Sequence, residues 1–94
     1  MSEVTVRHER DRNRFAATVD GHECELDYRI DGQVLTIQHT GVPEAVGGRG
    51  IAGQLTRATL DFARSQGFKV YPACSYAAVY FRRHPELADL LVRL

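Results

Sequence analysis

The hydrophobic pattern of this chain changes once, at a glycine-rich segment. Before it, apolar and polar residues alternate: in Glu23–Ile30 every even-numbered position is apolar and every odd-numbered position is charged. Alternation of this kind is typical of half-buried strands. After the glycines, apolar and small residues recur at helical spacing, and one helix face would hold Leu55, Ala58, Thr59, Phe62 and Ala63. The chain therefore divides into a strand-rich half and a helix-containing half.

Turn signals divide the first half into strands. Asp20-Gly21 and Asp31-Gly32 are pairs that supply the positive φ of two-residue hairpin turns. With the charged turn Arg10–Arg14, they predict a meander of four antiparallel strands. We expect these strands near residues 4–8, 15–19, 23–30 and 33–40. The phase of the third strand places Cys24 in the core.

The second half predicts a helix, a short strand and two further helices. The first helix is expected from Ala52 to a left-handed Gly67, and the strand over Phe68–Cys74. Ser75 is the expected N-cap of a helix that runs to Arg83. Pro85 would open a last short helix holding Leu87, Leu90 and Leu91. A strand reached through a helical crossover is normally parallel to its partner, so we predict one α+β sandwich domain over residues 1–94, with the fifth strand parallel to the fourth.

The charge balance excludes some partners. Twelve Lys and Arg residues match twelve Asp and Glu residues, and the formal net charge is zero. Duplex nucleic acid and anionic membranes are held largely by excess positive charge, so neither is an expected partner. The first thirteen residues contain no apolar signal segment, which favours a cytoplasmic location, where Cys24 and Cys74 would stay unpaired.

The glycine-rich turn predicts an anion site. Gly47, Gly48, Gly50 and Gly53 stand at the start of the first helix, where backbone N–H groups and the helix dipole favour phosphate. A P-loop is excluded because Gln54-Leu55 replaces its Lys-Ser/Thr pair. The letters of GxGxxG are present, but a dinucleotide site needs a first parallel strand and an acidic residue about 20 positions later. A turn that binds nothing is the remaining alternative.

The run from Gly47 to Ala52 resembles the (Gln/Arg)-x-x-Gly-x-(Gly/Ala) signature of GNAT-type N-acetyltransferases, with glycine in place of the first Gln or Arg. His39-Thr40, Cys74-x-Tyr76 and His84-Pro85-Glu86 are similar to small GNAT-like proteins. The resemblance implies a GNAT-like fold that binds acetyl-CoA at this turn and splays its fourth and fifth strands apart. The implied cofactor-binding residues are Val42, Gly47, Gly48, Arg49, Gly50, Ile51, Ala52 and Gly53.

The resemblance also implies where catalytic residues would lie. Cys74 ends the fifth strand and is either a nucleophile, a residue that lines the acetyl site, or an inert buried thiol. His39 is expected on the same strand face as Leu35 and Ile37, where it would relay a proton from the amine or serve a structural role. In GNAT proteins a tyrosine on the following helix protonates the leaving thiolate. Here Tyr80 stands one place before that position, and Tyr76 shares its helix face, so either residue is a candidate or a core packing residue.

Two functions follow as expectations. The first is an acetyl-CoA-dependent N-acetyltransferase acting on a primary amine, with a protein lysine as one candidate acceptor, and with no metal. The second is a CoA or acyl-CoA sensor that binds without efficient catalysis. The tight turns of the first half leave no room for the helices that larger relatives insert between their first strands, so we expect an open acceptor side.

Overall fold

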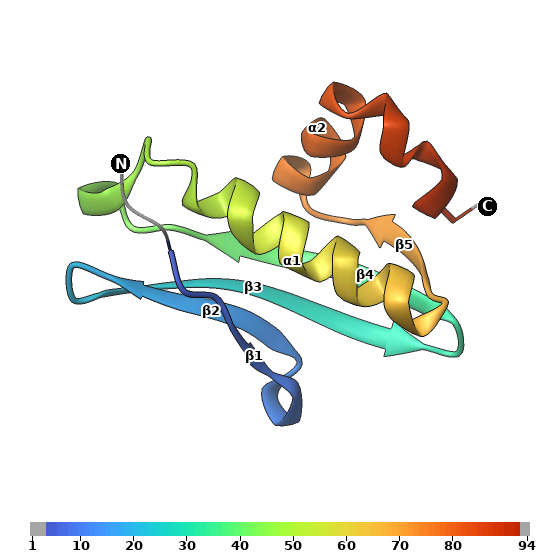
Figure 1. The fold of residues 1–94 in the computed structure, drawn as a ribbon, viewed down its shortest axis with the longest axis horizontal. Coiled ribbons are helices and arrows are strands. Elements are labelled where there is room, and N and C mark those ends of the chain that lie inside the picture. Colours follow the sequence, from blue (N-terminus) through green and yellow to red (C-terminus); the bar gives the residue numbers. More distant parts are fainter. Residues whose placement is uncertain (1–3, 93–94) are drawn as a thin grey trace.

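The computed structural model describes residues 4–92, which form a five-stranded sheet in the order β1-β2-β3-β4-β5. β1 (Arg7–Glu9), β2 (Arg14–Val19), β3 (His22–Asp31) and β4 (Val34–Gly41) pair antiparallel in sequence order. β5 (Lys69–Pro72) pairs parallel to β4. The predicted α+β meander with a parallel fifth strand is therefore confirmed (Figure 1).

Local chemistry fixes the hairpins. Asp20 and Gly21 both take left-handed φ values, 50° and 77°, and connect the paired residues Val19 and His22. Two successive positive φ values are the signature of the type I′ turn, whose twist matches that of the flanking strands. β1 begins three residues later than predicted and extends one residue further, to Glu9, where the 3₁₀ turn η1 (Arg10–Arg12) begins.

α1 (Ile51–Gln66) covers one face of the sheet and begins one residue before the predicted start (Figure 1). On the side of α1 that faces the sheet, Leu55, Leu60 and Ala63 are fully buried. Buried Thr56 and Thr59 donate their hydroxyls to the carbonyls four residues earlier, each at 2.8 Å, so their burial leaves no hydroxyl unpaired. Gly67 ends the helix at a left-handed φ of 77°, as predicted.

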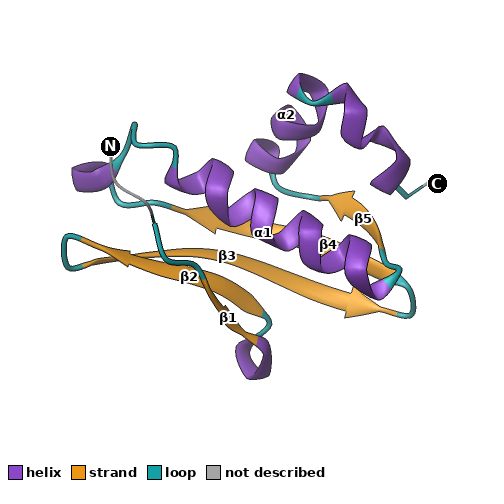
Figure 2. Ribbon diagram, viewed as in Figure 1, coloured by secondary structure: helices purple, strands orange, loops and turns teal. Residues whose placement is uncertain are grey.

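α2 (Ser75–Arg83) and the 3₁₀ segment η3 (Pro85–Leu90) follow β5, and η2 (Glu44–Val46) precedes α1 (Figure 2). The predicted N-cap was wrong by one residue: Cys74 has the extended backbone of an N-cap, and its Sγ accepts the Ala77 N–H at 3.4 Å. Leu91 does not extend the last helix but forms a bridge with Val70. Within residues 4–92, no helix is both long and apolar enough to cross a membrane.

The sheet has two unlike faces. The near face, which packs against α1, supplies the core, and its largest buried side chains from the strands are Leu26, Leu35, Ile37 and Val70. The far face is polar, and Arg7 and Arg14 form ion pairs there with Glu9, Glu23 and Glu25. A bulge separates the two registers of β4: Ile37 lies opposite Tyr28, whereas His39 lies opposite Asp27, leaving Gln38 as the extra residue.

Candidate functional site

The pairing between β4 and β5 ends halfway along β4. Their pairing runs from Val34↔Lys69 to Ile37↔Pro72, after which the Ile37 carbonyl accepts both the Ala73 and the Cys74 N–H, at 3.0 and 3.1 Å. β4 itself continues to Gly41 and stays paired with β3 to that point, apart from the bulge at Gln38. The splay implied by the family resemblance is therefore present, and it opens toward the glycine-rich turn.

A cavity of about 240 Å³ lies where three elements meet: the end of β4, the start of α1 and the first turn of α2. Tyr76 supplies the wall from α2. Of the eight residues predicted to bind cofactor, all but Arg49 line it: Val42, Gly47, Gly48, Gly50, Ile51, Ala52 and Gly53. The volume is below the roughly 300–1,000 Å³ of a pocket that encloses a whole drug-sized ligand, so it suits one segment of a longer molecule.

The start of α1 faces this cavity with its N–H groups free of side-chain caps. Gly50 is the N-cap at a left-handed φ of 75°, and within the described residues no side chain caps the helix. The first intrahelical bond runs from the Gln54 N–H to the Gly50 carbonyl at 3.1 Å. The preceding N–H groups and the helix dipole therefore remain available to an anion, which is the chemistry that a diphosphate needs.

Arg49 lies in the same turn, but its side chain is placed differently. Its Nη1 donates to Asp20 Oδ2 at 2.7 Å, in the turn between β2 and β3. Arg49 does not line the cavity, whereas both of its neighbours, Gly48 and Gly50, do. The backbone of the turn thus faces the cavity, and its one long side chain faces the hairpin.

Cys74 lies at the mouth of the splay. Its half-buried Sγ is 3.5 Å from Thr40 Oγ1 on β4 and 3.4 Å from the Ala77 nitrogen on α2. Thr40, which the sequence indicated only as part of the His39-Thr40 pair and without a role of its own, is therefore the residue that faces Cys74 across the gap. Cys24, by contrast, is fully buried, and burial raises the pKa of its thiol, as expected of an inert core cysteine.

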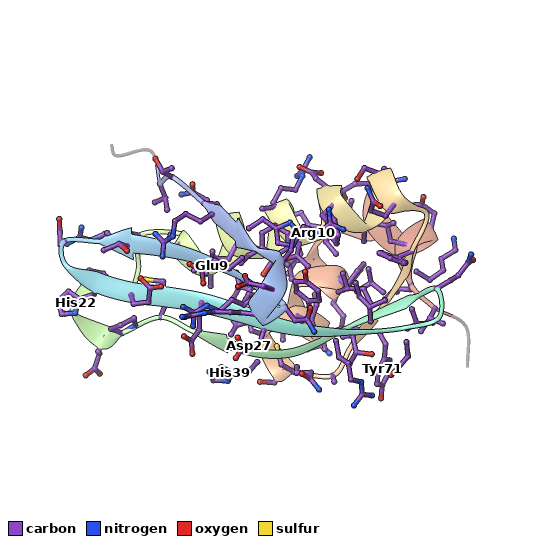
Figure 3. All side chains as sticks on the ribbon, turned by 90° about the horizontal axis from the view of Figure 1, so that it is seen from below. Glu9, Arg10, His22, Asp27, His39 and Tyr71 are labelled. Atoms are coloured by element: carbon purple, nitrogen blue, oxygen red, sulfur yellow. The ribbon has the colours of Figure 1, made fainter. Side chains whose placement is uncertain are left out.

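His39 lies on the far face, so the expectation that it shares a face with Leu35 and Ile37 was wrong. The Gln38 bulge shifts the alternation by one, and His39 projects beside Asp27 below the sheet (Figure 3). Its Nε2 is 3.8 Å from Glu25 Oε2. The possible ligand atoms of Glu25, Asp27 and His39 lie within 4.8 Å of one another, but the Arg14 guanidinium already sits 3.4 Å from Glu25 Oε1.

The two candidate tyrosines occupy different environments. Tyr76 is 39% exposed and lines the cavity, and partial burial raises the pKa of its hydroxyl, which therefore keeps its proton at neutral pH. Tyr80 is buried, with its ring stacked on His84 at a centroid distance of 4.1 Å. Both approach Gly53, where an added Cβ would lie 3.5 Å from the Tyr76 hydroxyl and 3.9 Å from the Tyr80 ring. Of the two hydroxyls, that of Tyr76 is the better placed proton donor toward the cavity.

Comparison with known proteins agrees with this arrangement. The family described as GCN5-related N-acetyl-transferase matches residues 14–90. Protein NATD1 of Mus musculus is 37% identical over 94 residues, covering 97% of this chain and 84% of the mouse protein. Protein NATD1 of Homo sapiens is also 37% identical, with 97% of this chain and 82% of the human protein covered.

A solved structure shares the architecture. The solution structure of a protein from Staphylococcus aureus, assigned as a GCN5-like N-acetyltransferase, superimposes with a TM-score of 0.77 at 28% identity. The alignment covers 100% of this chain and 93% of the staphylococcal chain. Together with the family match over most of the sequence, this shows that the chain belongs to the GCN5-related N-acetyltransferase family.

Proposed function

We propose that this chain transfers an acetyl group from acetyl-CoA to a primary amine. The observation that carries the proposal is the cavity at the uncapped start of α1, which adjoins the splay between β4 and β5. An uncapped helix start suits the diphosphate of a CoA molecule, and a splay offers unpaired strand edges to the extended pantetheine arm. When bound, acetyl-CoA would supply the activated acetyl thioester.

The residues around the cavity would divide the work of binding. The N–H groups from Gly48 to Gly53 would hold the diphosphate, and Val42 and Tyr76 would pack against the adjoining arm. Tyr76 stands two residues after Cys74, in the first turn of α2 beside the splay that would take the arm, and its hydroxyl keeps its proton at neutral pH, so it can give that proton to the departing thiolate.

The acceptor amine would approach from the far face of β4. Successive residues of a strand point to opposite faces, so His39 lies across the sheet from Thr40, which contacts Cys74. The exposed His39 imidazole, with the Glu25 carboxylate 3.8 Å away, can accept the proton that an ammonium group must lose before it attacks. Glu25 also pairs with Arg14, whereas Asp27 lies opposite His39, so the carboxylate of Asp27 beside the exposed imidazole suits the ammonium group of a lysine on a peptide.

Calorimetric titration with CoA and with acetyl-CoA tests the binding step, and thiol release with a panel of amines tests the transfer step. We expect binding of both molecules, and thiol release with lysine-containing peptides. Binding without thiol release for any amine would favour the sensor over the enzyme. No binding of either molecule would overturn both functions.

Ala52 offers a matched pair of variants for the binding step. Ala52→Glu and Ala52→Gln add similar bulk to the cavity wall, but only Glu adds a negative charge. Glu near a helix N-terminus is also favourable for folding, so a weakened fold would not explain a loss of binding. We expect Ala52→Glu to bind CoA at least tenfold more weakly than Ala52→Gln. Equal affinities would show that this cavity does not hold the phosphates.

Cys74 can be tested apart from its capping role. Ser and Cys can both accept the Ala77 N–H, but only Cys carries a thiol. If the thiol takes up the acetyl group during transfer, Cys74→Ser abolishes turnover, and intact-protein mass spectrometry of the wild type with acetyl-CoA shows one added acetyl group. If Cys74 only caps α2 and lines the splay, Cys74→Ser retains turnover and Cys74→Ala loses stability.

A further inference from the structure

The glycine-rich turn has a single side chain through which it can be held. Three of the four residues in the segment 47–50 are glycine, and Arg49 is the fourth. The segment runs between two almost fully buried anchors, Val46 at 1% and Ile51 at 2% exposed. Glycine backbone samples more conformations than any other residue, so without a tether this segment would be the least constrained part of the cavity wall.

The tether in the structure is an ion pair with Asp20. Arg49 Nη1 lies 2.7 Å from Asp20 Oδ2, and the two residues are 29 positions apart. The hairpin that carries Asp20 is a firm support, because its two turn residues take the left-handed φ values of a type I′ turn between the paired Val19 and His22. The pair therefore connects the flexible turn at the start of α1 to a rigid hairpin of the sheet.

The direction of the Arg49 side chain decides between two roles. Gly48 and Gly50 line the cavity and Arg49 does not, although it stands between them. A guanidinium that served as a ligand for the phosphates would have to leave Asp20 and turn toward the cavity. A guanidinium that stays on Asp20 would instead keep the neighbouring backbone N–H groups aimed at the cavity.

We infer that Asp20 and Arg49 are a positioning pair, which holds the glycine turn in the shape that binds the diphosphate of CoA. This inference rests on the proposed function, since it assumes that the cavity takes a CoA diphosphate. Ordering a turn before binding lowers the entropy lost on binding. The two side chains are 44% and 65% exposed, so solvent weakens the pair, and the effect on affinity is expected to be about two- to fivefold, in the upper part of what exposed ion pairs contribute.

Asp20→Asn and Arg49→Gln test the inference by calorimetry with CoA. Asn tolerates the left-handed backbone at position 20, so Asp20→Asn removes the charge and spares the turn. For a positioning pair, each change raises the Kd about two- to fivefold, and the double variant is no weaker than either single variant. If Arg49 instead binds the phosphates, Asp20→Asn leaves the Kd unchanged or lowers it, while Arg49→Gln raises it. That second pattern would overturn the inference.

A second readout needs no ligand. Backbone ¹⁵N relaxation of the free protein should show lower order parameters at Gly48 and Gly50 in both variants, toward the roughly 0.6 of flexible backbone. Arg64→Gln is the matched control, because it breaks another exposed Arg–Asp pair, with Asp89, at the far end of α1. It should change neither the Kd for CoA nor the order parameters of the turn.

The two readouts separate the inference from the proposed function. A wild-type protein that does not bind CoA would overturn the proposed function together with the binding role of the pair. A wild type that binds CoA, combined with variants whose order parameters and Kd are unchanged, would overturn the positioning pair alone.

Discussion

The two edges of β4 behave differently, and the difference locates the candidate site. Toward β3, β4 is paired from Val34 to Gly41, interrupted by one bulge. Toward β5, the same strand is paired only from Val34 to Ile37. The edge of β4 that faces β3 therefore stabilises the sheet over its full length. The second half of the edge that faces β5 is unpaired within the described residues, and it lies near Cys74, the cavity and the glycine-rich turn.

The point of separation is itself well anchored. Ile37 is fully buried, it lies opposite Tyr28 on one side and Pro72 on the other, and its carbonyl accepts two N–H groups. The splay is thus a fixed feature between packed strands rather than a frayed end. A site that must hold a long ligand in one register benefits from such a fixed opening, because little further ordering is needed on binding.

Ile37→Ala should give the largest effect, because it removes a fully buried side chain at the point where the two edges separate. We expect a loss of about 2–5 kcal/mol in the free energy of unfolding, measured by urea titration at neutral pH. Gln38→Ala, at the exposed bulge residue next to it, should change this free energy by less than about 0.5 kcal/mol. A loss below about 1 kcal/mol for Ile37→Ala would mean that the splay is not anchored there.

Tyr76→Phe should give the next largest effect, on turnover. If the Tyr76 hydroxyl protonates the leaving thiolate at the open edge, its removal lowers kcat by about 100-fold or more, with little change in the affinity for CoA. Tyr80→Phe, one helical turn later and stacked on His84, should retain most of the turnover. Steady-state kinetics of both variants decides the assignment, and an equal loss in both would count against a specific donor role for Tyr76.

The sequence predicted what depends on local pattern. Alternation and Asp-Gly turns are sufficient for the meander, and the left-handed Gly67 and the parallel fifth strand follow from equally local or topological rules. The glycine-rich turn was found because its composition is unusual, and all of its residues except Arg49 line the cavity.

What the sequence did not predict depends on register or on distant partners. The Gln38 bulge has no sequence signal of its own, yet it moves His39 to the other face of the sheet. The sequence also gives no sign of the partners of His8, whose ring stacks on Phe15 at 4.0 Å and whose Nε2 lies 2.7 Å from the Tyr28 hydroxyl. The pairing of Arg49 with Asp20 joins residues that are brought together only by the folded sheet. A strand pattern fixes which residues alternate, but one inserted residue or one distant side chain changes what they meet.

Gly50→Ala should have a smaller effect, on the free energy of unfolding, because Gly50 lies in the turn that borders the cavity. Gly50 has a φ of 75°, which costs a residue with a Cβ roughly 1–2 kcal/mol, although an added Cβ would meet nothing within 4 Å. Gly47→Ala is the matched control, since Gly47 also lines the cavity but has a φ of −66° that alanine adopts without strain. Urea titration should show the loss only for Gly50→Ala. Equal stabilities would mean that the backbone of the turn relaxes and does not require a left-handed residue.

The smallest effect is expected at the closed end of β5, where the pairing with β4 begins. Asp89 of η3 accepts two hydrogen bonds from Arg64, at 2.9 and 3.3 Å, and its carbonyl accepts Lys69 Nζ at 2.6 Å. The Arg64 guanidinium holds the pKa of the Asp89 carboxyl below its usual value. A lowered pKa in the folded state means that the ionised carboxylate favours folding above its unfolded pKa, near 4, and that this contribution is lost as the pH falls through the lower, folded value.

Asp89→Asn should therefore lower the urea midpoint slightly at pH 7, and this difference should shrink as the pH falls below about 4, because the wild-type contribution is lost progressively between the unfolded and the lower, folded pKa. The pair is exposed, so the difference at pH 7 should also shrink at 1 M salt. A difference that stays the same size at pH 3 and at 1 M salt would assign the effect of the substitution to packing instead of charge. If the closed end of β5 depends this weakly on its ion pair, its position rests mainly on the buried Val70, on the bridge to Leu91 and on the pairing with β4. The position of β5, and with it the splay, would then depend on apolar contacts and backbone pairing that do not change with pH.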